Sequence, residues 1–363
     1  YLLAGIILGP FVFNVIDTIT FQIASDIRQI ALMIILMRAG LNLQISDLKK
    51  VGSSALLMCF VPASFEIIGL MILAPIFLHL DLLNAALLGT VLAAVSPAVV
   101  VPLMLKLMDE GYGTKEGIPQ LIMAGASMDD VYVIVLFTSL LTLAKSGEFN
   151  ALSLLRIPTS ILFGIISGIV LGYVLCKLYR LLKLSTEIEL ASMFAIGMIL
   201  ITIERMMVGV VGFSGLLAIM AMTAAIRHIK PEMADKYSAI LAKLWQPAEI
   251  FLFALVGASV RIDYALSFGP VVLVVIILAL LFRMLGVYLS IMQTKFNRKE
   301  RIFTMIAYIP KATVQAAIGG LALEAGLASG ELILTTAVTA ILVTAPLGAI
   351  FISFTYRNFL QKA

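Results

Sequence analysis

The sequence is poor in charged residues. Lys, Arg, Asp and Glu together make up 13% of the 363 residues, whereas 62% are hydrophobic. A soluble domain carries roughly a quarter charged residues, so this composition excludes an ordinary soluble globular protein. The formal net charge of +4 does not indicate a nucleic-acid-binding protein, because the basic residues lie in short segments between apolar runs.

Residues of metal and redox chemistry are also scarce. The two histidines, His79 and His228, fall in or near predicted loops, so they indicate neither a metal centre nor a histidine base. The two cysteines, Cys59 and Cys176, lie in apolar segments and are interpreted as free thiols. The sequence therefore predicts neither an enzyme nor a protein with a cofactor.

Long apolar runs dominate what is present, many of them near the 20 residues that a helix needs to cross a bilayer. They are rich in Leu, Ile, Ala and Met and do not alternate with polar residues, which favours helices over strands. We therefore predict an all-α polytopic membrane protein with about twelve helices. The predicted spans are 1–16, 22–42, 50–78, 83–107, 119–144, 154–180, 187–205, 212–228, 239–261, 266–293, 302–324 and 332–356.

The basic residues predict an orientation. Most Lys and Arg residues follow even-numbered spans, as do Lys49, Lys50, Arg298, Lys299 and Arg357. Cytoplasmic loops are enriched in Lys and Arg, so we place these loops and the C-terminus in the cytoplasm of a multi-pass cell-membrane protein. The chain starts without Met in what reads as the middle of a helix, so we expect one or more helices before its first residue.

The chain resembles itself weakly at a spacing of about 215 residues, or about seven helices, which predicts an inverted-topology repeat. Ser96-Pro97 in one half corresponds to Pro310-Lys311 in the other, and Glu66 corresponds to Arg283. Inverted repeats with interrupted helices are typical of secondary transporters, whose substrate site lies near the midplane of the membrane.

Charged residues within predicted spans are costly in a membrane and usually functional. Glu66 and Arg283 fall near the middle of corresponding spans, and we predict that they form an intramembrane ion pair. Asp129 and Asp130 are adjacent in the span 119–144, where Ser127 adds polar support. Neighbouring residues point about 100° apart on a helix, so the two carboxylates face different surroundings.

The aspartate pair is the predicted ion site. Carboxylate oxygens in a poorly hydrated site hold either a proton or a small hard cation. If a proton and Na⁺ compete for Asp129 and Asp130, both cannot be carried at once, and a site that opens alternately to each side becomes an exchanger. We therefore expect Na⁺ to bind at these two residues.

Prolines predict two interrupted helices. Proline removes a backbone donor, and the freed carbonyls of an interrupted helix line transporter sites. Ser96 and Pro97 mark one interruption and Pro310 the other, with Thr313 and Gln315 as polar residues beside it. Lys311, which directly follows Pro310, is expected to pair with Asp129 or Asp130.

Six segments resemble the monovalent cation/proton antiporter superfamily, and the closest similarity is to its NHA branch of sodium/proton exchangers. The resemblance covers nearly the whole chain. The segments are Tyr1-Leu-Leu-Ala-Gly-Ile-Ile-Leu-Gly-Pro, Arg38-Ala-Gly-Leu-Asn-Leu, Val95-Ser-Pro-Ala-Val-Val-Val-Pro, Gly111-Tyr-Gly, Ser127-Met-Asp-Asp and Pro310-Lys-Ala-Thr-Val-Gln-Ala-Ala-Ile-Gly.

The resemblance implies two crossed, broken helices, a homodimer and an elevator-like movement of a core domain, with Asp130 as the direct cation ligand. Arg283 stands where well-known two-aspartate relatives have a lysine. An arginine at this position resembles electroneutral exchangers, so the number of protons exchanged per cation stays open. The implied organisation is scaffold helices in 1–45 and 211–262, core transport helices in 46–145 and 263–363, and linking helices in 146–210.

The predicted function is a sodium (lithium)/proton antiporter that serves pH homeostasis. A potassium/proton antiporter of the same superfamily is the alternative, although those relatives usually lack the second acidic residue and carry a cytosolic nucleotide-binding domain. The longest loops here are only about twenty residues. An intramembrane aspartyl protease is disfavoured, because adjacent carboxylates on one helix cannot flank a peptide bond.

Overall fold

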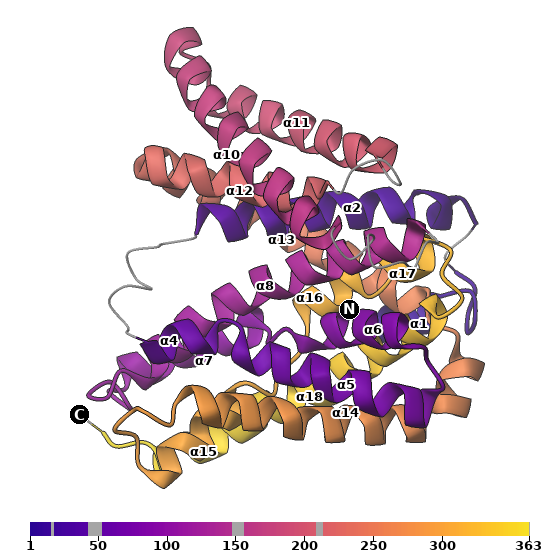
Figure 1. Ribbon diagram of the computed structural model, residues 1–363, viewed down its shortest axis with the longest axis vertical. Helices are drawn as coiled ribbons and strands as arrows, with labels where there is room; N and C mark the ends of the chain where they lie inside the picture. Colours follow the sequence, from indigo (N-terminus) through magenta and orange to yellow (C-terminus); the bar gives the residue numbers. More distant parts are fainter. Residues whose placement is uncertain (16–17, 43–52, 147–155, 208–212, 363) are drawn as a thin grey trace. The chain divides into compact units, whose positions relative to one another are not determined.

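The computed structural model describes residues 1–15, 18–42, 53–146, 156–207 and 213–362 (Figure 1). Throughout these ranges the regular structure is helical, and one isolated bridge joins Tyr112 to Lys362. The all-α prediction is therefore confirmed for the described part of the chain.

The helices form two compact units. Unit 1 comprises Tyr1–Gln44 and Val135–Ser259, and unit 2 comprises Ile45–Ile134 and Val260–Ala363. The boundary between Ile134 and Val135 divides a single helix, α8 (Ile118–Ser146). The assignment of scaffold and transport roles to the units stays a prediction.

Eight helices in the described ranges are long and apolar enough to cross a membrane, and Gln29–Leu41 and Gly215–Ile229 are shorter apolar helices. The predicted number of about twelve spans is not confirmed. The helix observed in the predicted span 1–16 is shorter than predicted. Helix α1 (Leu2–Leu8) ends before Gly9, whose backbone is extended. Pro10 follows, and the residue before a proline is disfavoured in helical conformation.

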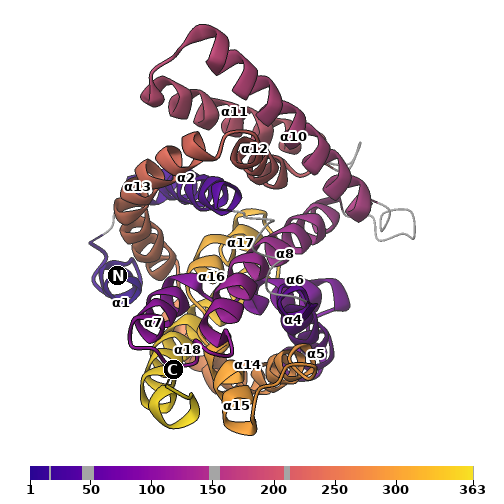
Figure 2. The ribbon, with the colours of Figure 1, turned by 90° about the vertical axis from the view of Figure 1, so that its left-hand side faces the viewer.

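Unit 1 is packed through small residues. Its remaining helices are α2 (Thr18–Leu41), α10 (Arg156–Leu182), α11 (Thr186–Met207), α12 (Gly215–Ile229) and α13 (Pro231–Ala258). Helix α2 lies beside both α12 and α13, as its nearly end-on view in Figure 2 shows. A Cβ added at Gly168 of α10 would lie 2.3 Å from the carbonyl oxygen of Ala218 in α12, so glycine is what allows these helices to approach so closely.

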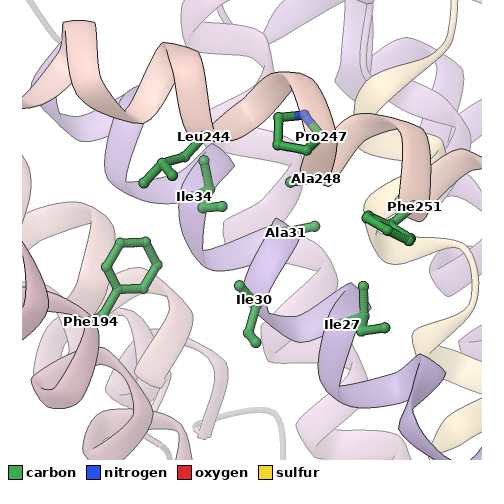
Figure 3. Close-up of a pocket in the computed structure, with 9 residues that line it drawn as sticks. All are labelled: Ile27, Ile30, Ala31, Ile34, Phe194, Leu244, Pro247, Ala248 and Phe251. Carbon is green, nitrogen blue, oxygen red and sulfur yellow. The ribbon is translucent and has the colours of Figure 1, made fainter.

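Unit 1 also contains an apolar cavity of about 310 Å³ (Figure 3). It lies between α2 and α13, and Phe194 of α11 is also among the residues that line it. Its lining offers no charged group that would hold an ion. The lining residues are Ile27, Ile30, Ala31, Ile34, Phe194, Leu244, Pro247, Ala248 and Phe251.

Unit 2 is built around two interrupted helices. Helix α5 packs against both α6 and α14, and α18 contacts α7, α15, α16 and α17. The helices are α4 (Ser53–Met58), α5 (Val61–Leu78), α6 (Leu82–Ala93), α7 (Pro97–Asp109), α14 (Ile262–Ser290), α15 (Arg298–Ala307), α16 (Thr313–Ile318), α17 (Leu321–Glu324) and α18 (Gly330–Phe359), with the first part of α8.

Both interruptions coincide with the prolines. Ser96 adopts extended backbone angles directly before Pro97, which begins α7 at a position where no N–H is needed. Residues 308–312 separate α15 from α16, and Pro310 lies among them. The two interruptions meet, because the Ser96 N–H donates a hydrogen bond of 2.8 Å to the carbonyl of Pro310.

Candidate functional site

The carboxyl end of α6 forms the centre of the candidate site. The last carbonyls of a helix lack partners within the helix and carry partial negative charge. Lys311 Nζ donates to the carbonyl of Leu92, and Arg283 Nη1 donates to that of Ala93. Gln315 Nε2 donates to the carbonyl of Ala94 over 2.8 Å. Side chains from α14 and from the segment around the second interruption therefore cap the carboxyl end of α6, where the first interruption begins.

Arg283 links two carboxylates. Its Nη1 lies 3.0 Å from Glu66 Oε2, and its Nη2 lies 2.6 Å from Asp129 Oδ2. Its Nε donates to the carbonyl of Tyr308 over 2.9 Å. The side chain is 1% exposed, so these are charge-assisted bonds in a medium of low dielectric constant. The residues predicted to form an ion pair, Glu66 and Arg283, thus lie in direct contact.

Lys311 pairs with Glu66 rather than with an aspartate. Its Nζ lies 2.7 Å from Glu66 Oε1, and its side chain is fully buried. The expected pairing of Lys311 with Asp129 or Asp130 was therefore wrong. The physical reason is that the Leu92 carbonyl, at the carboxyl end of α6, accepts a hydrogen bond from Lys311 Nζ and so holds the ammonium group beside Glu66.

The two aspartates differ in their surroundings, as their adjacent positions on a helix predict. Asp129 is fully buried and is held by Arg283 and the Val95 N–H through one oxygen. Its other oxygen, Oδ1, is buried without a hydrogen-bond partner among the described residues. Asp130 is partly exposed, and its Oδ1 is likewise buried without a partner in the described part of the chain. Asp129 is therefore neutralised by Arg283, whereas Asp130 forms an ion pair with none of the described Lys or Arg side chains.

The remaining predicted residues lie around the two interruptions. Ser96 is fully buried at the start of α7, and its hydroxyl has no partner in the described ranges. Thr313, 8% exposed, begins α16, and Gln315 lies within the same short helix. Ser127 lies in α8, but its side chain falls outside what the structure describes.

Sequence reasoning missed Tyr308 and Thr344. The Thr344 hydroxyl accepts a hydrogen bond of 3.0 Å from the Lys311 N–H, which fixes the backbone beside Pro310. The Tyr308 ring lies beneath the Arg283 guanidinium, with 5.3 Å between the guanidinium carbon and the ring centroid. The one available signal was that Tyr308 stands two residues before Pro310 within an interrupted span.

The described residues contain no group of three or more His, Cys, Asp or Glu side chains that would hold a resident metal ion. The candidate site instead combines buried oxygen atoms that have no partner in the described ranges with a nearly balanced set of buried charges.

Comparisons with known proteins agree on the family. The family model "Sodium/hydrogen exchanger, transmembrane" matches residues 1–357. The sodium/hydrogen exchanger 9B2 of Homo sapiens is 34% identical over 379 residues, which cover 99% of this chain and 70% of the relative. The 9B2 protein of Xenopus tropicalis is 33% identical over 393 residues, with the same coverage.

Among solved structures, the sodium proton antiporter MjNhaP1 from Methanocaldococcus jannaschii superimposes with a TM-score of 0.83. The two chains are 20% identical, and the match covers 99% of this chain and 91% of the other, which establishes a shared fold. The predictions of a multi-pass membrane protein, of a transporter rather than an enzyme, and of a protein without a cofactor are confirmed by the family. The chain belongs to the sodium/hydrogen exchanger family of membrane transport proteins.

Proposed function

We propose that the protein is a sodium (lithium)/proton antiporter in which the cation and protons compete for Asp129 and Asp130. The observation that carries this proposal is the unequal pairing of the two carboxylates. Asp129 is neutralised by Arg283, whereas Asp130 is partly exposed and has a buried oxygen without a partner in the described ranges. Asp130 is therefore the direct ligand, and Asp129 supplies the second carboxylate.

The balance of buried charge supports exchange of one ion for one ion. When all groups are ionised, Glu66, Asp129 and Asp130 carry three negative charges, and Arg283 and Lys311 carry two positive charges. A single proton or a single monovalent cation makes the site neutral. An uncompensated charge in a membrane core is costly, so the loaded site is the form that crosses, with either Na⁺ or H⁺ bound.

The two interruptions supply the remaining site elements. Ser96 and Gln315 each present a buried oxygen without a partner in the described chain, while Pro97, Pro310 and Thr313 shape the backbone around them. Neutral hydroxyl and amide oxygens suit Na⁺ and Li⁺, which are small hard cations. Lys311 acts as the charge partner of Glu66 at the interrupted helix and keeps that carboxylate from competing for the cation.

We further propose the transport arrangement that the resemblance implies. Unit 2, which holds every residue of the site, forms the moving core, and unit 1 provides the scaffold of a homodimer. The two interrupted helices belong to inverted repeats, and the loops after even-numbered spans and the C-terminus face the cytoplasm. The apolar lining of the unit 1 cavity supports a scaffold role, since that cavity offers an ion no ligands.

Proteoliposomes with an internal pH indicator test the activity. Addition of external Na⁺ or Li⁺ should alkalinise the vesicle lumen, because protons leave as the cation enters, and K⁺ should not. Asp130→Asn should abolish this exchange, with a loss of about 100-fold or more, because a neutral amide cannot hold a proton and Na⁺ in turn.

Asp109→Asn is the matched control, because Asp109 is an exposed carboxylate at the end of α7 in the same unit. It should retain exchange within about twofold of the unmodified protein. Full activity of Asp130→Asn would contradict the proposed site, and a response to K⁺ equal to that to Na⁺ would favour the potassium alternative.

A further inference from the structure

Tyr308 occupies a position beside the site that its role in packing does not explain. It caps the end of α15, its side chain is 1% exposed, and its hydroxyl has no hydrogen-bond partner within the described residues. A buried tyrosine hydroxyl usually finds a partner, since burying it without one costs about 1–3 kcal/mol. Phenylalanine would fill the same space without that cost.

The hydroxyl lies against α8 one turn before Asp129. A Cβ added at Gly125 would come within 2.0 Å of the Tyr308 hydroxyl oxygen, so that oxygen lies directly over the α8 backbone. Residues four apart share one face of a helix, and helical side chains lean toward the N-terminus. The Asp129 side chain therefore leans toward the turn over which the Tyr308 hydroxyl lies.

Two buried oxygens without partners in the described ranges thus gather over one face of α8. One is Asp129 Oδ1 and the other is the Tyr308 hydroxyl, and they come from different parts of the chain. Tyr308 is also held from two sides, since its carbonyl accepts from Arg283 Nε at 2.9 Å and its ring lies beneath the Arg283 guanidinium. Arg283 in turn binds the other oxygen of Asp129, so the same arginine orients both groups.

We propose that the Tyr308 hydroxyl is a neutral oxygen ligand of the transported cation, which it shares with Asp129 Oδ1. This inference rests on the proposed function and adds a ligand from the second interruption to it. The hydroxyl stays protonated throughout the cycle, and its oxygen lone pairs face the cation. Gly125 is required because any side chain there would displace the hydroxyl.

Tyr308→Phe tests the proposal, because it removes the oxygen and keeps the ring beneath Arg283. In proteoliposomes we expect the KM for Na⁺ to rise about three- to tenfold, with the maximal rate changed by less than about twofold. Tyr288→Phe is the control: Tyr288 is an exposed tyrosine of α14 in the same unit, and its loss should leave the KM unchanged.

Gly125→Ala tests the geometry from the other side. Introduced alone, the added methyl group should displace the hydroxyl and raise the KM. Combined with Tyr308→Phe, where no hydroxyl remains to be displaced, it should raise the KM by less than it does alone, because only the approach of the added methyl group to Met58 Cβ, at 2.9 Å, is left. A double-mutant cycle that gives additive effects would contradict the contact on which the inference depends.

Thermal unfolding of the purified protein with increasing Na⁺ provides a readout independent of transport. A bound cation raises Tm, and Tyr308→Phe should need several-fold more Na⁺ for the same rise. An unchanged KM and an unchanged Na⁺ dependence of Tm in Tyr308→Phe, with Asp130→Asn inactive, would overturn this inference alone. An active Asp130→Asn protein would instead overturn the proposed function.

Discussion

The two units of the protein differ in what their interiors contain. Unit 1 brings helices together through glycines, as where Gly168 of α10 meets the backbone at Ala218, and its cavity is lined by apolar side chains. Unit 2 buries Glu66, Asp129, Arg283 and Lys311 around interrupted helices. The cavity of unit 1 is therefore lined without charged residues, whereas charged residues are concentrated at the centre of unit 2.

This difference shows where each unit's constraints lie. In unit 1 the constraint is steric, because close approach of helices requires small residues. In unit 2 it is electrostatic, because each buried charge is tolerated only with its partner. Substitutions that preserve volume should therefore be harmless at the apolar helix contacts of unit 1 and damaging in the charged centre of unit 2. Substitutions that add volume should be most damaging at the glycine contacts of unit 1.

The largest effect is expected from Glu66→Gln, which preserves volume but leaves both Arg283 and Lys311 with one partner fewer. Removing one member of a buried ion pair costs about 3–5 kcal/mol. The free energy of unfolding, or Tm in detergent, should fall accordingly.

Glu331→Gln is the matched control for that loss. Glu331 lies 3.7 Å from Arg261, and the two side chains are 41% and 44% exposed, so their pair contributes about 0–1 kcal/mol. Equal stability of the two variants would mean that the buried network of unit 2 is not under electrostatic constraint.

A smaller effect is expected from Gly168→Ala in unit 1. The added Cβ would lie 2.3 Å from the Ala218 carbonyl oxygen, so α10 and α12 would have to move apart. This separation should lower the free energy of unfolding by about 1–3 kcal/mol. Gly269→Ala is the control, because a Cβ on Gly269 of α14 meets nothing within 4 Å and should stabilise the helix by about 0.5–1 kcal/mol. If the two variants melt alike, close packing does not constrain unit 1.

Much of unit 2 was predictable from the sequence, and the prolines show why. Pro97 and Pro310 lack the donor that a continuous helix needs, which favours an interruption at each position. The residue type alone does not decide it, since Pro75, Pro102 and Pro346 lie inside continuous helices. The adjacent positions of Asp129 and Asp130 likewise predict their different surroundings, because neighbouring residues diverge on a helix.

The pairing of charges was not predictable in the same way. Lys311 was expected beside an aspartate, but its partner is Glu66. That choice depends on where the carboxyl end of α6 lies, since its free carbonyls attract both Lys311 and Arg283. Tyr308 was missed for a related reason: its contact with Gly125 joins residues from distant parts of the chain, and no local pattern encodes it.

The most direct test of the account is whether Na⁺ and H⁺ compete for one site. The KM for Na⁺ should be measured in proteoliposomes across a series of pH values, with both sides at the same pH. If one proton competes with Na⁺, the KM should rise as the pH falls, by at most about tenfold for each pH unit. The maximal rate, extrapolated to saturating Na⁺, should stay constant. A maximal rate that falls with pH while the KM stays constant would contradict a shared site at Asp129 and Asp130.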